Sequence, residues 1–248
     1  CRLQLPRATR SIEEIEGLAF GAERLVGSTE ERFHMNIAIL TLDAFNELDS
    51  FISAGILNRM RPMGWKAYIT SPTPTVVSMN GVTVHAERDL AFASEADAVL
   101  IGSGSRTREL VKDAALLGKI RLDPTRQLIG AQCSGTLLLA KLGLLENRPA
   151  CTDVITKPWV IEAGVRVLDQ PFYAEGNVAT AGGCLAQQYL AAWVMLRAGS
   201  REDVEYALDY VSPVGEKADY VQRALANVER YITERDKRVL TPAVSTVR

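Results

Sequence analysis

The segment IGAQCSGTLLLAKLGLL contains the residue best placed to do chemistry, Cys133, between a run typical of a strand and a run typical of a helix. The small residues Ala131, Ser134 and Gly135 suit a tight strand-to-helix turn, which parallels the GxSxG elbow although that pattern is absent. A cysteine at such a turn is exposed near the positive end of the following helix, which favours the nucleophilic thiolate. The alternative is a buried cysteine that packs as a small apolar side chain.

A short glycine-rich loop, Gly102-Ser103-Gly104, follows the apolar run at residues 98–101. Glycines at a strand end let backbone N–H groups approach a ligand and form a nest for an anion. Because open α/β sheets bind ligands at the carboxyl ends of their strands, we expect this loop and Cys133 at the same edge. A plain turn is the alternative interpretation of the loop.

Two acidic residues, Glu47 and Asp49, follow the first predicted strand in the sequence AFNELDSF. Helical spacing directs Leu48 inward, so that one of the two carboxylates is positioned to face the end of the sheet. The alternative is an acid that only stabilises the positive end of the helix.

The elements that must position these groups alternate between strand and helix. Strands are predicted at residues 36–42, 66–70, 75–79, 98–101, 128–132, 165–168 and 177–180, with an Asn80-Gly81 hairpin turn after the third. Helices are predicted at residues 45–60, 107–117, 135–142, 181–198, 202–210 and 218–234. This alternation is typical of an α/β protein with a mostly parallel sheet and helices on both faces.

The composition excludes several classes of partner. The chain has 248 residues and a net charge of −2, with 28 basic and 30 acidic residues well mixed, so nucleic acid is not an expected partner. No apolar run approaches the ~20 residues that span a bilayer, so a membrane is not expected either. A small-molecule substrate remains the expected partner.

None of the four cysteines forms a CxxC motif, and the chain has only two histidines. Both observations argue against a structural zinc site. A disulfide framework is not expected in a chain with so large a core, and the predicted compartment is the reducing cytoplasm.

Three regions are predicted along the chain. Residues 1–34 form an N-terminal extension, which is either non-native or an arm that docks on a partner subunit. Residues 35–215 form the α/β domain, and residues 216–248 add a C-terminal helix and a loose tail.

Four segments in order resemble the ThiJ/PfpI superfamily, a branch of the class I glutamine-amidotransferase-like fold. These are NIAILTLDAFNELD, ADAVLIGSGSRTRELV, IGAQCSGTLLLAKLGLLENRPACTD and GNVATAGGCLAQQYLAAWVM, which cover nearly everything from residue 35 to about residue 215. Within the superfamily the chain is most similar to the isonitrile hydratase (cyclohexyl-isocyanide hydratase) subgroup. The resemblance implies a flavodoxin-like three-layer α/β/α sandwich with a mostly parallel sheet.

The resemblance assigns roles to the residues already singled out. Cys133 matches the nucleophile, and Asp49 matches the acid that hydrogen-bonds to it. The loop that begins at Gly102 matches the one whose backbone amides, at Ser103 and Gly104, help to form an oxyanion pocket.

Three further positions complete the site that the resemblance implies. Ser134 follows the nucleophile and its N–H is the second oxyanion donor, while Gly182 and Gly183 match the glycine pair at the floor of the site. No cofactor or metal ion is implied. Relatives form homodimers, and an apolar helix with Phe51, Ile52 and Ile56 is the expected interface.

One departure from the superfamily narrows the chemistry. Members that act as proteases or glyoxalases carry a histidine shortly after the elbow helix, where this chain has Asp153. We therefore expect a cysteine-dependent hydratase that converts an isonitrile to an N-substituted formamide. A non-catalytic ligand-binding or redox-sensing protein is the main alternative, and a glyoxalase- or amidase-like enzyme ranks below it.

Overall fold

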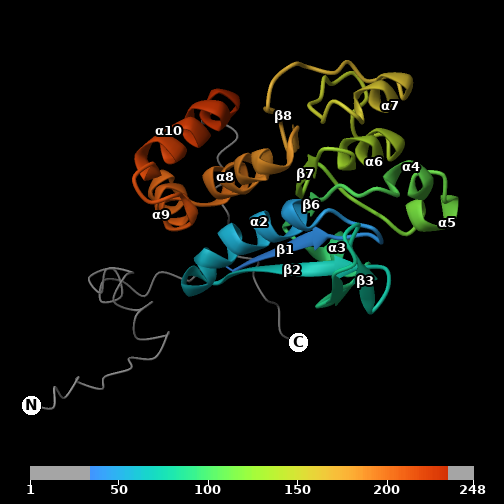
Figure 1. Ribbon diagram of the computed structural model, residues 1–248, viewed down its shortest axis with the longest axis horizontal. Helices are drawn as coiled ribbons and strands as arrows, with labels where there is room; N and C mark the ends of the chain where they lie inside the picture. The colour runs from blue at the N-terminus through green and yellow to red at the C-terminus, as the bar shows by residue number, and fades with distance from the viewer. Residues whose placement is uncertain (1–33, 234–248) are drawn as a thin grey trace, which may run out of the picture. The chain divides into compact units, whose positions relative to one another are not determined.

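A seven-stranded sheet forms the centre of the computed structural model, which describes residues 34–233 (Figure 1). Its strand order is β5-β2-β1-β6-β7-β9-β8, and every neighbouring pair is parallel except β8 with β9. The strands are β1 (Met35–Leu40), β2 (Trp65–Ser71), β5 (Arg88–Asp89), β6 (Ala98–Ile101), β7 (Leu128–Gln132), β8 (Phe172–Glu175) and β9 (Val178–Ala181). The prediction of a mostly parallel sheet is confirmed.

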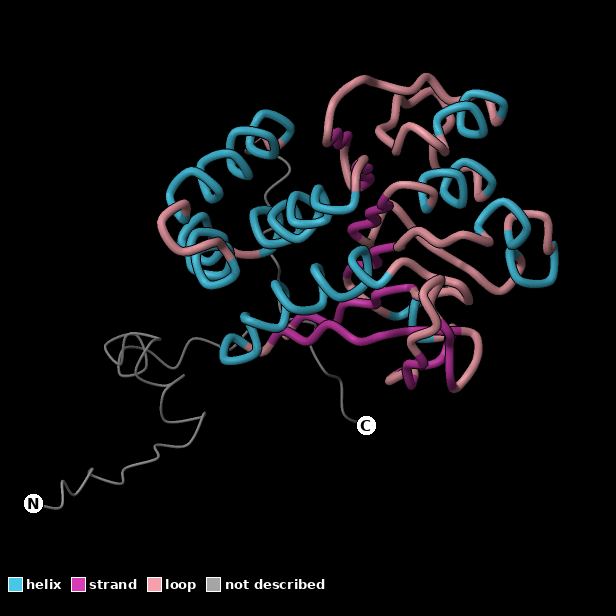
Figure 2. Tube along the Cα trace, viewed as in Figure 1, coloured by secondary structure: helices cyan, strands magenta, loops and turns pink. Residues whose placement is uncertain are grey.

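Two layers of helices cover the two faces of this sheet (Figures 1 and 2). One layer contains α2 (Glu47–Leu57), α8 (Gln187–Ala198), α9 (Arg201–Val211) and α10 (Lys217–Val228), with the short 3₁₀ helices η1 (Asn58–Met63), η2 (Cys184–Ala186) and η3 (Glu229–Tyr231). The other contains α3 (Phe92–Glu95), α4 (Thr107–Leu110), α5 (Ala114–Leu117), α6 (Gly135–Lys141) and α7 (Lys157–Glu162). The three-layer α/β/α architecture follows.

Alternate side chains of the central strands divide between the two apolar cores. In β6, Ala98 and Leu100 pack under α8 and α2, whereas Val99 and Ile101 pack under the layer that contains α6. Because both faces of the strand are covered, its sequence is apolar without alternation, as the run AVLI indicates. Val221 and Leu225 of α10 join the same core as α8.

Several predicted elements differ from the structure. The predicted helix at residues 107–117 is two short helices, because Asp113 caps α5 by accepting hydrogen bonds from the N–H groups of Ala115 and Leu116. The predicted helix at 181–198 begins only at Gln187. The predicted strand at 165–168 makes just one bridge, from Val167 to Ala150.

Other predictions hold, and a few lie outside the described residues. The Asn80-Gly81 turn joins β3 (Thr75–Val77) to β4 (Thr83–His85) in an antiparallel hairpin, as predicted. Strand β8 and helix α7 are elements that the apolar patterns missed. The predicted extension, apart from its last residue, and the predicted loose tail lie outside the described residues.

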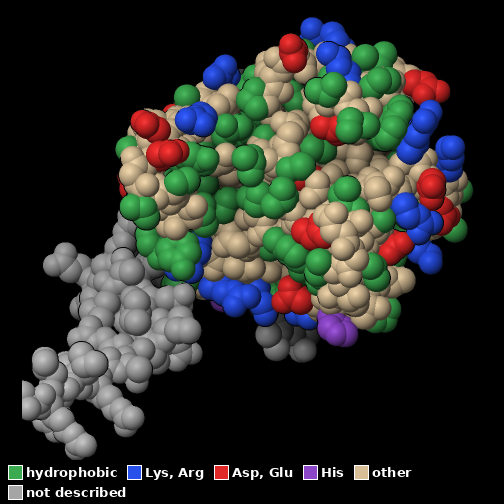
Figure 3. Space-filling view, in the orientation of Figure 1, with side chains coloured by type: hydrophobic (Ala, Val, Ile, Leu, Met, Phe, Trp, Pro, Cys, Tyr) green, Lys and Arg blue, Asp and Glu red, His purple; other side chains and the backbone are tan. Residues whose placement is uncertain are grey.

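The surface carries mixed charge. In Figure 3, Lys and Arg side chains alternate with Asp and Glu over the face shown. In the described part of the chain, no helix has both the length and the apolar composition needed to cross a membrane.

Replacement of Trp193, which is fully buried on α8, tests the core between helices and sheet. Trp193→Ala is expected to lower the free energy of unfolding by about 3–5 kcal/mol, because it removes the ring and leaves a cavity. Val214→Ala, at a side chain that is 94% exposed, is the control and is expected to change it by less than about 0.5 kcal/mol. Urea denaturation measures both, and equal stabilities would contradict this description of the core.

Candidate active site

Cys133 occupies a strained turn between β7 and α6. Its φ of 49° lies in the left-handed region, which a residue with a side chain rarely adopts. Three hydrogen bonds hold it there: its N–H donates to the carbonyl of Ala181 at 2.9 Å, and its own carbonyl accepts from Thr136 N–H at 3.1 Å and Thr152 Oγ1 at 2.7 Å. Backbone strain that is held so firmly is typical of functional sites.

Gly135, the first residue of α6, allows this turn to pack directly on the end of β6. A Cβ atom at this position would lie 2.7 Å from the carbonyl oxygen of Ile101 and 2.9 Å from that of Gly102. Backbone atoms have little room to yield, so only glycine fits without displacing the helix from the sheet.

Asp49 brings a carboxylate to the same edge of the sheet from the first turn of α2. The residue is fully buried, and its Oδ2 accepts a hydrogen bond of 3.0 Å from the Ser103 N–H. Its Oδ1 is buried and has no hydrogen-bond partner among the described residues. A carboxylate oxygen of Asp49 and the Sγ atoms of Cys133 and Cys184 all lie within 4.8 Å of one another. The hydrogen bond expected between Asp49 and Cys133 is not formed among the described residues, where Ser103 N–H is the donor to Asp49 and Gln132 is the donor to Cys133.

Glu47, the other acid of the pair, faces elsewhere. It accepts hydrogen bonds from Ser78 Oγ and from Asn80 Nδ2, the latter at 2.8 Å, and so ties α2 to the β3–β4 hairpin. The hydrogen bond from Ser78 lowers the pKa of the Glu47 carboxyl. The two acids therefore have different roles, and only Asp49 belongs to the site.

The loop after β6 differs from the predicted oxyanion pocket. The N–H of Ser103 donates to Asp49, and the N–H of Gly104 donates to Ser134 Oγ at 3.2 Å. Both amides are thus committed to acceptors within the protein, because the loop packs tightly against α2 and α6. Thr107 Oγ1 lies 2.8 Å from the same Ser134 oxygen and completes this connection.

The remaining predicted donor differs from these two. Among the described residues, the N–H of Ser134 donates to no protein acceptor. Its role as an oxyanion donor stays a prediction.

The glycine pair after β9 shapes the opposite side of the site. A Cβ atom at Gly182 would lie 2.2 Å from the carbonyl oxygen of Thr152, so the two backbones touch. Gly183 has a φ of 84°, and its carbonyl oxygen accepts a hydrogen bond of 2.5 Å from Gln132 Nε2. This turn places Cys184 next to Cys133.

The acids of the site are buried together without a basic side chain. Burial raises the pKa of the Cys133 thiol far above its usual range, and the charges of Asp49 and Asp153 raise it further. Burial likewise raises the pKa of Asp49 and of Cys184. The expectation of an exposed thiolate at a helix end was wrong, because Cys133 is only 3% exposed and burial outweighs the field of the short helix α6.

Histidine is not part of the site. Of the two in the chain, His85 is an exposed residue of β4, and His34 is an exposed residue just before β1. Asp153, to which the resemblance assigns the position of a histidine, accepts hydrogen bonds from the N–H groups of Ile155 and Thr156. It therefore caps the turn before α7.

Three residues of the site lack a clear signal in the sequence. Asn46 Nδ2 donates to Cys184 Sγ at 3.2 Å, and Gln132 Nε2 donates to Cys133 Sγ at 3.4 Å. Asn46 is recognisable only as the cap of α2, where its side chain accepts from the N–H of Leu48. Cys184 itself stands in an apolar run that is typical of a core residue.

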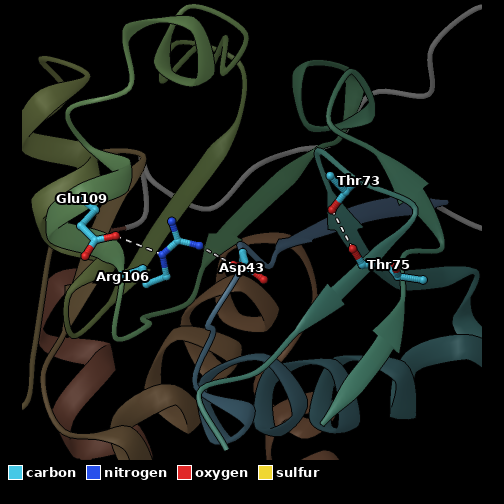
Figure 4. A network of polar contacts seen from close by, with 5 residues as sticks. All are labelled: Asp43, Thr73, Thr75, Arg106 and Glu109. Carbon is cyan, nitrogen blue, oxygen red and sulfur yellow. Dashed lines mark hydrogen bonds and ion pairs between the residues drawn. The ribbon is translucent and has the colours of Figure 1, made fainter. Parts of the chain in front are cut away.

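An exposed ion-pair network holds the loop after β6 from its outer side (Figure 4). Arg106 contacts Asp43, in the loop after β1, at 2.7 Å and Glu109 at 3.0 Å. In the same view Thr73 Oγ1 donates to the carbonyl of Thr75 at 2.7 Å, at the start of the β3–β4 hairpin. The Arg106 contacts join the loop after β1 to the loop after β6, although exposed ion pairs contribute little stability.

Comparisons with known proteins agree on one relationship. The model of the DJ-1/PfpI family matches residues 35–197. Among solved structures, DJ-1 of Schizosaccharomyces pombe is 20% identical with a TM-score of 0.62, over 72% of this chain and 99% of its own. DJ-1beta of Drosophila melanogaster is 18% identical with a TM-score of 0.64, over 72% of this chain and 98% of its own.

A further solved structure spans more of the chain. A ThiJ/PfpI family protein from Pseudomonas syringae is 16% identical with a TM-score of 0.64, over 83% of this chain and 95% of its own. At such identities the likeness extends to the fold alone. The comparison with curated proteins gives no match.

Substitution of Gly135 tests the packing that supports the turn. Gly135→Ala is expected to lower the free energy of unfolding by about 1–3 kcal/mol, because the methyl group overlaps two carbonyl oxygens. Gly55→Ala is the matched control: Gly55 lies inside α2 with no atom near the added Cβ, so a gain of about 0.5–1 kcal/mol is expected. Chemical denaturation measures both, and a stabilised Gly135→Ala would overturn the close approach.

Alkylation tests the burial of the thiols. Cys184 is partly exposed whereas Cys133 is not, so iodoacetamide at neutral pH is expected to label Cys184 before Cys133. Peptide mapping of the labelled protein by mass spectrometry gives the order. Faster labelling of Cys133 would show an accessible thiolate and contradict the effect of burial on its pKa.

Proposed function

Because the chain belongs to the DJ-1/PfpI family, we propose that it is a cysteine-dependent hydratase that adds water to an isonitrile. The observation that carries the proposal is the buried Asp49 carboxylate within 4.8 Å of the Cys133 sulfur, in a cluster that contains no histidine. Family membership restricts the fold and leaves the reaction open, so the proposal depends on this pair.

The first step forms a covalent intermediate on Cys133. The sulfur bonds to the terminal carbon of the isonitrile, and the thiol proton passes through Asp49 to the same carbon. The product of this step is a thioimidate, R–N=CH–S–Cys. Burial raises the pKa of the Asp49 carboxyl group. A carboxyl group of this kind suits the transfer, because it can accept the thiol proton and then donate it to the carbon.

The second step releases the formamide. Asp49 takes a proton from a water molecule as the water oxygen adds to the carbon of the C=N bond, and Asp49 passes that proton to the nitrogen. The C–S bond then breaks, the proton of the new hydroxyl group returns to the sulfur through Asp49, and an N-substituted formamide leaves. The N–H of Ser134 is the proposed donor to the polar intermediate.

Steric and electrostatic features favour this substrate over an amide. The reacting carbon of an isonitrile is terminal and bonded to nitrogen alone, so it can approach a thiol that is only 3% exposed. Hydrolysis of an amide needs an acid for the leaving amine and commonly uses the histidine of a Cys-His pair. The site has no histidine for this role and contains the carboxyl group of Asp49 instead.

The homodimer implied by the resemblance remains a proposal, but one of its expected interface residues must be removed. Phe51 on α2 is 41% exposed and is available to a second copy. Ile56 is 1% exposed and belongs to the core of the same subunit, so it is not an interface residue.

Turnover of cyclohexyl isonitrile tests the reaction. The purified chain is expected to form N-cyclohexylformamide, and Cys133→Ala is expected to abolish it. Asp49→Asn is expected to lower kcat by about 10²–10⁴-fold, the usual contribution of a general acid–base group. Gas chromatography with mass spectrometry measures the product.

The matched control is Cys151→Ala, which removes a buried thiol outside the cluster and is expected to keep the native rate. Circular dichroism of each variant separates loss of chemistry from loss of fold. Equal turnover by the native chain and Cys133→Ala would exclude the mechanism.

A further inference from the structure

Three acidic side chains from separate elements converge at the site. Asp49 comes from α2, Cys133 from the turn after β7, and Cys184 from η2, and one ligand atom of each lies within 4.8 Å of the other two. In a tetrahedral zinc site, bond lengths of about 2.0–2.3 Å place neighbouring ligand atoms about 3.3–3.8 Å apart. A contraction of about 1.5 Å or less would convert the cluster to that geometry.

Each of the three groups accepts a hydrogen bond from an N–H donor. Asn46 Nδ2 donates to Cys184 Sγ, Gln132 Nε2 donates to Cys133 Sγ, and the Ser103 N–H donates to Asp49 Oδ2. Such donors stabilise the deprotonated forms of their acceptors and fix the direction of the free lone pairs. Outer hydrogen bonds of this kind orient the ligands of metal sites.

No basic side chain in the described part of the chain contacts the cluster. Among the described residues, no Lys, Arg or His side chain forms an ion pair or hydrogen bond with any of the three. Asp49 Oδ1 is buried and accepts no hydrogen bond from an N–H or O–H group in the same part of the chain, and the thiol that interacts with the Asp49 carboxyl group is that of Cys184. Burial of an acceptor without such a donor costs free energy of desolvation, and a bound cation would offset that cost.

We infer that Asp49, Cys133 and Cys184 bind a thiophilic divalent cation, for which Zn²⁺ is the best match. The donor set is two sulfurs and one oxygen, whereas Mg²⁺ and Ca²⁺ require oxygen ligands. Binding forms two metal–sulfur bonds and one metal–oxygen bond and releases the two thiol protons. Three protein ligands leave a fourth position for water.

This inference is independent of the proposed reaction, although the two compete for one sulfur. A Cys133 thiolate that shares a lone pair with the cation is a weaker nucleophile than the free thiolate, and an Asp49 carboxylate bound to the same cation no longer carries protons. The metal-bound form is therefore expected to lack hydratase activity, and removal of the cation is expected to restore it. Metal binding itself has a spectroscopic readout that needs no turnover.

A Co²⁺ titration of the full chain tests the site. The protein is reduced with a phosphine, freed of metal by a chelator, and exchanged into chelator-free buffer. We expect one Co²⁺ per chain with a thiolate-to-cobalt charge-transfer band in the near ultraviolet, which one equivalent of Zn²⁺ abolishes. A native chain that binds Co²⁺ without this band would overturn the inference.

Four variants locate the site. Cys184→Ser keeps the size of the side chain and is expected to weaken Co²⁺ binding at least about 100-fold, since a direct ligand outweighs an outer hydrogen bond. Asn46→Ser keeps a side chain able to cap α2 but removes the donor to Cys184, and about 10-fold weaker binding is expected. Cys151→Ala and Cys1→Ser are the controls and are expected to bind as the native chain does.

Measurements of folding distinguish the loss of a metal ligand from the loss of the fold. Circular dichroism and thermal unfolding of metal-free Cys184→Ser are expected to match the native chain, because the exchange is nearly isosteric at a partly exposed position. Native affinity in Cys184→Ser overturns the inference, and so does loss of binding in Cys151→Ala or Cys1→Ser. If Cys184→Ser does not fold, the Co²⁺ affinity of Asn46→Ser is the test, and native affinity in that variant overturns the inference.

Discussion

The left-handed turn at Cys133 is the constraint around which the rest of the site is built. Its N–H must reach Ala181 at the end of β9, and its carbonyl must meet the side chain of Thr152. These contacts are possible only because β7 and β9 are parallel neighbours with Gln132 opposite Ala181. The strained residue is therefore stable only inside the completed sheet.

Close backbone contacts around the turn follow from the same constraint. Gly135 lets α6 approach the carbonyls at the end of β6, and Gly182 lets β9 run against Thr152. Gly104 is under similar restriction, since a Cβ there would lie 2.6 Å from the carbonyl oxygen of Ala44. Small residues in these loops thus reflect packing between backbones, and they bring three acidic side chains within a few ångströms of one another.

The balance between burial and hydrogen bonding determines the chemistry of the cluster. Burial disfavours the ionised forms of Asp49, Cys133 and Cys184, whereas N–H donors from three different elements favour them. A site in this state holds protons readily and yields them to a suitable electrophile or cation. In the proposed hydration the thiol proton goes to the substrate carbon, and in the inferred metal binding the thiol protons are released when the cation binds.

The sequence by itself determined the layers of the fold and the position of Cys133 at the end of a strand. Buried strands such as AVLI at 98–101 and the run at 128–132 are apolar because both faces are covered, and this pattern is local. It predicted the main strands of the sheet. It did not predict β8, whose sequence FYAE is short and mixed.

Only the tertiary structure decided which groups meet and in what state. Glu47 and Asp49 differ by about 200° around α2, so the docking of that helix determined which acid enters the site. The roles of Asn46 and Cys184, 138 positions apart, depend on how α2 and η2 pack. The raised pKa of Cys133 has the same origin, because burial is a property of the surrounding elements and local sequence does not contain it.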